Sequence, residues 1–455
     1  MKSYVPVIIT LFATNHALAQ GANAPVGSTA TPQQPATTPT AASGAPSVAG
    51  EAASPAATVP TNTPTEPAAA AVPGPAPNTA TAAAPVAPAV PPAAAEDGPR
   101  PAAAGPLKIE LPNATIKFGF LLQPQYEALG SPALNSASNN IFLRRTRFIV
   151  GATFFKYFEF FFETDYPNLF KAANNTATET NNKATPGMNV QDAFGTIKAV
   201  GDALKIDLGY MLPPGAHNAV QGAGTLYSWD YFTNSFRHSN VFHSTADPVG
   251  RDTGAQLRGL VLNDIVEYRV GMFQGKRDDV SATQVSGRNM FRVAGRLQIN
   301  LLDPETGFFY AGSYLGTKRV LSFGVSYDFQ DGYHHSSGDG ILDLPLGPGV
   351  LTAQADVSHW NGGTWVDLPR QSAFMSEVGY LFDAANLSPI FRFERRWVDD
   401  KTRAPDESRV GGGLAFWPYG HNFNVKAFYT RIIPNPNPNG HDYNQAVVQA
   451  QFYVF

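Results

Sequence analysis

The fold is constrained most by an alternation of apolar and polar residues that recurs, in stretches of about ten residues, over most of the chain. Successive side chains of an extended strand point to opposite faces. Residues 116–128 therefore carry an apolar face that includes Ile116 and Phe118. The opposite face is polar and includes Lys117 and Gln123. Further stretches of this kind cover residues 204–212, 319–329 and 423–430. The alternation predicts an all-β protein.

Short turns and longer polar loops separate these strands in alternation. The short turns are predicted near residue 156 and at 201–202, 263–264, 303–307, 347–349, 383–386 and 419–421. The longer loops are predicted at 131–139, 167–189, 213–251, 276–287, 331–338, 361–369, 399–406 and 434–442. These connections join about sixteen strands into a transmembrane antiparallel β-barrel. An even number of strands means that the first strand begins and the last strand ends on the periplasmic side.

The first residues of the chain predict export. Lys2 precedes an apolar stretch, and small residues around Ala17 and Ala19 complete a cleavable signal peptide of residues 1–19. That stretch is shorter than the roughly 20 residues that a membrane-spanning helix needs. The chain ends on the aromatic Phe455, which is typical of barrels delivered to the outer-membrane assembly machinery. We therefore predict a location in the outer membrane of a Gram-negative bacterium, in contact with its lipid and lipopolysaccharide.

The barrel, residues 107–455, follows a segment of different composition. Residues 20–106 are dominated by Ala, Pro and Thr, and this composition predicts a disordered periplasmic linker. A tether that contacts peptidoglycan or a partner is the alternative. The chain contains no cysteine, which excludes disulfides and thiolate chemistry. Its net charge of −4 argues against binding of nucleic acid.

Arginine is concentrated on the predicted lumen face of several strands. In residues 288–300, Arg288, Arg292 and Arg296 share one parity, and apolar residues share the other. A guanidinium group stays charged at working pH and can bind two oxygens of a phosphate at once. Arginines arranged around a pore select anions. The predicted pore-lining and anion-binding residues are Arg145, Arg147, Arg258, Arg269, Arg288, Arg292, Arg296, Arg392 and Arg396.

Carboxylates share the lumen face with these arginines, which leaves a second interpretation open. By the same parity, Glu163, Asp165, Asp207 and Glu267 also point inward. Ion pairs between the two sets would produce fields across the pore rather than a net preference for anions. The alternative to an anion-favouring channel is therefore a general porin, non-selective or permeable to sugars that the loop aromatics guide.

The longest loop, residues 213–251, is long enough to be functional. We predict that it folds into the lumen and narrows the channel, with Arg237 and Arg251 in the constriction. Its histidines, such as His217, are spaced irregularly and are interpreted as solvated loop residues rather than metal ligands, as is His335 in another predicted loop. No metal or cofactor is predicted. The sequence contains no recognisable nucleophile motif, so we do not predict an enzyme.

Residues 116–455 resemble the phosphate-selective porin O and P family. The resemblance rests on FLRRTRFIVGATFFKYFEFFFETDY at 142–166, on Pro213-Pro214-Gly215, on GRDTGAQLRG at 250–259 and on the arginine-rich strand after Gly287. It implies a trimeric sixteen-stranded outer-membrane channel with an inward third loop and with lumen arginines and lysines that bind phosphate-like anions. By motif match it assigns Arg145, Arg147, Arg251, Asp252 and Arg258 to the pore or its constriction. The long loop departs from the family's pattern because it contains no lysine.

Taken together, these patterns predict an outer-membrane porin through which small hydrophilic solutes diffuse, with a preference for small anions such as phosphate. A soluble exported β-protein, for example a sugar-binding sandwich or propeller, is the alternative from a different class. Such a protein would be extracted into buffer without detergent.

Overall fold

The computed structural model describes residues 105–131, 137–172, 187–233, 250–275, 290–362, 369–402, 405–435 and 441–455. The predicted signal peptide and all but the end of the predicted linker lie outside these residues. The strands are β1 (Leu107–Leu111), β2 (Ala114–Gly130), β3 (Ala137–Phe154), β4 (Phe158–Asp165), β5 (Asn189–Val200), β6 (Leu204–Met211), β7 (Asp252–Val261), β8 (Val266–Phe273), β9 (Arg292–Asn300), β10 (Val320–Gln330), β11 (Tyr333–Pro345), β12 (Gly349–Asn361), β13 (Gln371–Phe382), β14 (Leu387–Val398), β15 (Asp406–Tyr419), β16 (Phe423–Asn435) and β17 (Tyr443–Val454).

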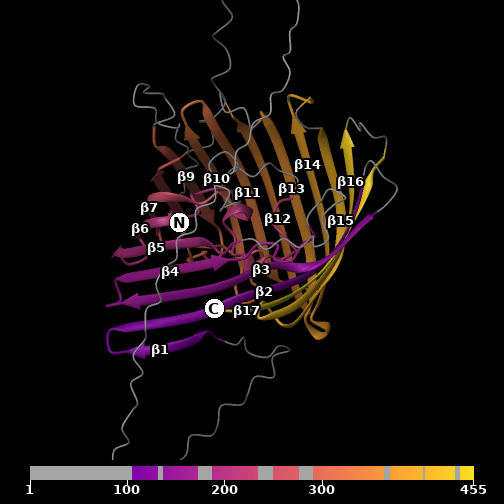
Figure 1. Cartoon of the computed structure of the whole chain (residues 1–455). Coiled ribbons are helices and arrows are strands. Elements are labelled where there is room, and N and C mark those ends of the chain that lie inside the picture. Colours follow the sequence, from indigo (N-terminus) through magenta and orange to yellow (C-terminus); the bar gives the residue numbers. More distant parts are fainter. Residues whose placement is uncertain are drawn as a thin grey trace, which may run out of the picture. The chain divides into compact units, whose positions relative to one another are not determined.

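Strands β2 to β17 form one closed antiparallel ring (Figure 1). Each strand pairs with the next in sequence, and β17 closes the ring on β2, where Gln449 lies opposite Gln125. The prediction of about sixteen strands is therefore confirmed. The short β1 lies outside the ring and pairs with the first residues of β2, with Leu107 opposite Phe118. We call the end where β2 begins and β17 ends the turn end, and the opposite end the loop end.

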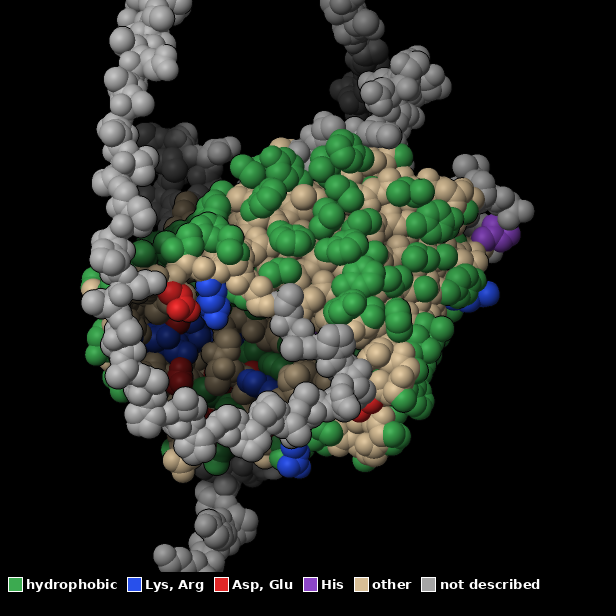
Figure 2. Space-filling view, turned by 90° about the horizontal axis from the view of Figure 1, so that it is seen from below, with side chains coloured by type: hydrophobic (Ala, Val, Ile, Leu, Met, Phe, Trp, Pro, Cys, Tyr) green, Lys and Arg blue, Asp and Glu red, His purple; other side chains and the backbone are tan. Residues whose placement is uncertain are grey.

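The wall of the barrel is apolar outside and polar inside. On β10, Phe323, Val325 and Tyr327 are 53%, 58% and 51% exposed, whereas Ser322 and Asp328 are buried in the lumen. Figure 2 shows hydrophobic side chains spread over the outside of the wall, with Lys, Arg, Asp and Glu gathered in a hollow. This is the arrangement of a barrel with a lipid face and a water face. Among the described residues, no helix is long and apolar enough to cross a membrane.

Two connections differ from the sequence-based expectation. The predicted loop 331–338 is wrong, because Gln330 pairs with Tyr333 across a two-residue turn in which Asp331 has a φ of +52°. The polar run that suggested a loop continues as strand β11, whose inward side chains can be polar because they face the lumen. The predicted short turn 303–307 is also wrong. Residues 301–319, here called the inner turn, connect β9 to β10 and fold into the barrel, where Tyr310 and Ser313 are buried.

The third loop connects β6 to β7, and its described residues 212–233 also lie inside the barrel, as predicted. Two 3-10 turns, η1 (His217–Val220) and η2 (Ala223–Thr225), shape it. On the far wall, the Lys426 ammonium of β16 donates to the carbonyl oxygens of Leu226 at 2.7 Å and Ser228 at 3.0 Å. The loop therefore crosses the lumen.

We expect a charge on the outer wall to destabilise the barrel in lipid. Val325→Arg places a guanidinium at the middle of β10 on the apolar face and should lower the free energy of unfolding by about 2–4 kcal/mol. Guanidinium chloride unfolding in lipid vesicles measures the change, and Val325→Ala is the control for the lost side chain. Equal stabilities for the two variants would contradict a lipid-facing wall at this position.

Candidate functional site

All of the predicted lumen arginines that the structure describes point inward. Arg145, Arg147, Arg258, Arg269, Arg292, Arg296 and Arg392 are buried, and Arg396 is half-buried. Arg251 and Asp252, predicted for the constriction, are buried where the third loop joins β7. Arg237 and Arg288 lie outside the described residues. The alternation of side chains along each strand therefore predicted correctly that these arginines face the lumen.

The lumen arginines form ion pairs with inward carboxylates. Arg147 on β3 bonds both Glu163, at 3.1 Å, and Asp165, at 3.0 Å, on β4. Similar pairs join Arg258 to Asp207, Arg269 to Glu267, Arg292 to Asp328, Arg296 to Asp339, and Arg251 to Asp192. Buried charges need such partners because their loss of hydration is otherwise uncompensated. Much of the arginine charge is thus balanced within the wall.

Three arginines fix the third loop across the lumen. Arg145 bonds the Asp230 carboxylate at 2.6 Å and Arg144 bonds it at 3.0 Å. Arg392, on β14, donates to the Ser228 hydroxyl and to the Asp230 carbonyl, both at 2.6 Å. The loop is therefore held at its far side by buried, charge-assisted hydrogen bonds, which are among the stronger ones in proteins.

Arg144 reaches Asp230 because of a β-bulge. Gln123 pairs with Arg145 and Pro124 pairs with Leu143, so that Arg144 is an extra residue on β3. Proline lacks the N–H that a regular ladder would use, and it is tolerated inside a sheet at such irregularities. Strand parity places Arg144 on the outer face, so sequence reasoning missed it. The signal that was available is Pro124 in the middle of a predicted strand.

The third loop meets the inner turn inside the barrel. The N–H of Tyr310 donates to the Val220 carbonyl at 3.1 Å, and the N–H of Gly222 donates to the Tyr310 carbonyl at 2.9 Å. The N–H of Gly312 donates to the Thr225 carbonyl at 2.9 Å. Connections from opposite ends of the barrel thus form one continuous partition.

A buried histidine joins the two connections through its side chain. The Nε2 of His217 lies 3.0 Å from both oxygens of Glu305, and the His217 ring stacks on the Tyr310 ring at 4.6 Å. Burial acts to raise the pKa of Glu305. The charge of His217 and the hydrogen bonds from His217, Tyr314 and Gln298 outweigh burial, so that the pKa of Glu305 lies below its ordinary value. The interpretation of His217 as a solvated residue is therefore wrong, because the loop folds inward and buries it.

His335 is also buried rather than solvated. It lies on β11, in the stretch wrongly predicted as a loop, and its ring stacks on Trp360 at 4.8 Å. His335 is buried because strand β11 begins at Tyr333, so that this residue lies in the wall with its side chain toward the lumen.

The inner turn is attached to the wall at both of its sides. Arg269 donates to the Phe308 carbonyl at 2.6 Å on one side. On the other side, the Ser313 hydroxyl donates to Asp343 at 2.7 Å and His421 lies 2.8 Å from the Ser313 carbonyl. The partition therefore spans the lumen from β8 to the turn between β15 and β16.

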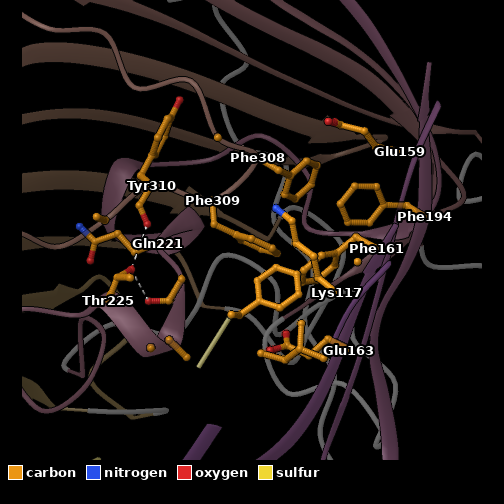
Figure 3. Close-up of a pocket in the computed structure, with 18 of the residues that line it drawn as sticks. Lys117, Glu159, Phe161, Glu163, Phe194, Gln221, Thr225, Phe308, Phe309 and Tyr310 are labelled. Carbon is orange, nitrogen blue, oxygen red and sulfur yellow. Dashed lines mark hydrogen bonds between the residues drawn. The ribbon is translucent and has the colours of Figure 1, made fainter. Parts of the chain in front are cut away.

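A cavity of about 530 Å³ lies near the turn end, between the partition and the wall formed by β2 to β7 (Figure 3). Phenyl rings gather in it. The Phe161 ring lies 5.6 Å from that of Phe194, 5.5 Å from that of Phe309 and 5.6 Å from that of Phe455. Phe308 completes the group at 4.4 Å from Phe194. Sequence reasoning missed this site, because two of the rings come from the inner turn.

The lining of the cavity is rich in cations. Among the described residues, its cationic side chains are Lys117, Arg147, Lys205, Arg251, Arg258 and Lys318, and its acidic ones are Glu159 and Glu163. Several carboxylate partners of the arginines, Asp165, Asp192 and Asp207, lie outside the lining. These pairs therefore contribute their arginines to the lining, whereas these three carboxylates take no part in it.

No protein-family model and no curated protein sequence matches the chain. Solved structures of outer-membrane channels do match. The anion-selective porin from Comamonas acidovorans is 9% identical over 75% of this chain and 99% of its own, with a TM-score of 0.51. OmpF of Salmonella typhi, solved with daunomycin, is 12% identical over 76% and 100%, with a TM-score of 0.48. The outer membrane channel DcaP of Acinetobacter baumannii is 11% identical over 77% and 100%, with a TM-score of 0.46.

The likeness to the Comamonas acidovorans porin shows that this chain has the fold of a porin barrel. The match covers nearly all of that chain, and the three quarters of this chain that it covers correspond in size to the barrel. The resemblance to the phosphate-selective porin family remains a prediction from the sequence.

We expect Glu305→Gln to weaken the contact between the two inner connections. The charged hydrogen bonds of Glu305 are buried, so the variant should lose about 1.5–3 kcal/mol of unfolding free energy at neutral pH. A carboxylate whose pKa is lowered in the folded protein contributes stability above its unfolded pKa of about 4.3 and loses it as the pH falls through the folded value.

The difference between the Glu305→Gln variant and the unaltered protein should therefore shrink below about pH 4. Guanidinium chloride unfolding at several pH values measures it, with Glu110→Gln on the exposed β1 as the matched control. A difference that is constant from neutral to acid pH would contradict the role given to the Glu305 charge.

Proposed function

We propose that the protein is an outer-membrane porin, a channel for passive diffusion of small hydrophilic solutes that favours anions such as phosphate. The observation that carries this proposal is the cavity near the turn end, where cationic side chains outnumber acidic ones although the whole chain has a net charge of −4. Local charge at a narrow point decides which ions pass, whereas the overall charge does not.

The path that we infer lies on the β2–β7 side of the partition. There the arginines present guanidinium groups to the passage and keep carboxylates such as Asp192 and Asp207 behind them. The pairing balances the net field in the wall but leaves the cation closer to a passing solute. A cation that lies nearer to the passage than its paired carboxylate can attract anions. A preference for anions therefore does not require an unpaired arginine.

The apolar outer wall supports a location in the outer membrane, where the barrel contacts lipid and lipopolysaccharide. The barrel fold shared with the anion-selective porin from Comamonas acidovorans agrees with this proposal. We further propose that the chain assembles as a homotrimer, as the resemblance to phosphate-selective porins implies.

Planar-bilayer recordings in a KCl gradient test the function. We expect discrete conductance steps and a reversal potential of the sign that marks chloride as the more permeant ion, with phosphate also carrying current. Arg147→Gln should lower the chloride-to-potassium permeability ratio about twofold, because it removes one cation from the cavity and leaves Glu163 with only its longer pair to Arg251, at 4.0 Å. Glu163→Gln should raise the ratio by a similar factor. Lys156→Gln, in the exposed turn between β3 and β4, is the control.

Cation selectivity of the unaltered protein would contradict the preference for anions. A reversal potential near zero, together with rapid swelling of proteoliposomes in sugar solutions, would instead identify a general porin. Purification into buffer without detergent as a non-conducting protein would exclude both.

A further inference from the structure

We infer that the cavity near the turn end is a binding site for a carboxylate carried on an aromatic ring. The assignment to a permeant solute rests on the proposed porin function. The binding site itself rests on the arrangement of rings and cations in the cavity. At about 530 Å³, the cavity has the size of sites that enclose small organic molecules.

The apolar half of the site consists of phenyl rings from separate parts of the chain. Phe161 and Phe194 come from adjacent wall strands, and Phe308 and Phe309 come from the inner turn. The rings are tilted or edge-on to one another, with the Phe308 and Phe309 planes at 75°. Such faces and edges accept another aromatic ring in the orientations that aromatic pairs prefer.

The charged half of the site is Lys117 on β2. Its side chain lines the same cavity as the rings of Phe161, Phe308 and Phe309, and Figure 3 draws these side chains together. Within the described residues, no carboxylate pairs with the Lys117 ammonium, in contrast to Arg147 and the other arginines of the cavity. A ligand with a carboxylate on an aromatic ring would neutralise this partly buried cation and would also cover the apolar rings of the cavity.

A second cation of the cavity contacts one of these rings directly. The guanidinium carbon of Arg258 lies 5.4 Å from the centroid of Phe308, a cation–π contact. Arg258 is paired with Asp207, so it contributes a positive face to the cavity without requiring a ligand. The positive potential therefore extends along the ring wall.

Other solutes fit this chemistry less well. An inorganic phosphate ion could be attracted by the cations of the lining, but it has no apolar part to cover the rings. A small aliphatic acid would neutralise Lys117 but would leave the apolar lining that the phenyl rings form uncovered. A neutral aromatic molecule would leave the ammonium uncompensated.

Equilibrium dialysis with labelled benzoate tests the inference on the full-length protein in detergent. We expect saturable binding, with acetate and benzyl alcohol competing about tenfold less well than unlabelled benzoate. Lys117→Gln should weaken benzoate about tenfold, because it removes the opposite charge. Phe309→Ala should weaken it about fivefold, because it removes a ring from the wall.

Lys156→Gln and Phe391→Ala, on the exposed turn and on the outer face of β14, are the matched controls and should bind as the unaltered protein does. Heat-modifiable gel mobility confirms that each variant is folded. Equal competition by benzoate and acetate, or unchanged binding in folded Lys117→Gln, would overturn the inference.

A parallel bilayer recording separates this inference from the proposed function. Benzoate that reduces the chloride current of the unaltered channel more than it reduces that of Lys117→Gln places the site on the path. Conductance and anion preference without benzoate binding would overturn the site and leave the porin intact. Benzoate binding without conductance would support the site and contradict the channel.

Discussion

Closure of the hydrogen-bonded ring is the constraint on which the rest of the structure depends. In lipid, every backbone N–H and C=O of the wall needs a partner within the protein, and only a closed barrel supplies one to each strand. Pairing of β17 with β2 completes the ring, and it fixes which side chains face inward. Because successive side chains alternate, closure creates both the apolar outer wall and a lumen lined by charge.

The charged lumen in turn requires internal pairing. Lumen arginines such as Arg147, Arg258 and Arg292 each bond a carboxylate from a neighbouring strand, and Arg392 bonds the third loop as well. Pairing keeps the loss of hydration from destabilising the barrel. It also uses most of the arginine charge for structure, so that the local charge of the cavity depends on which partner of each pair lines it.

Alternation predicted the strands and the inward faces of the described arginines, because each inward or outward position depends only on local parity. It did not predict the inner turn or its contacts. Phe308 lines the cavity and Tyr310 joins the partition because residues 301–319 fold back through the lumen. The alternation of residues along strands contains no information about the path of such a connection. The available signal was a run rich in aromatic residues and too long for a short turn. The error at His335 had the opposite cause, since polar residues resembled a loop although they face the lumen.

The bonds between the third loop and the inner turn have a mechanical consequence. One connection enters from the loop end and the other from the turn end, and backbone hydrogen bonds from Gly222, Tyr310 and Gly312 join them at the middle. A loop attached at one mouth could swing outward alone, but here each connection restrains the other. Any motion that widens the passage must either break these hydrogen bonds or carry both connections together, and the aromatic cavity changes shape with them.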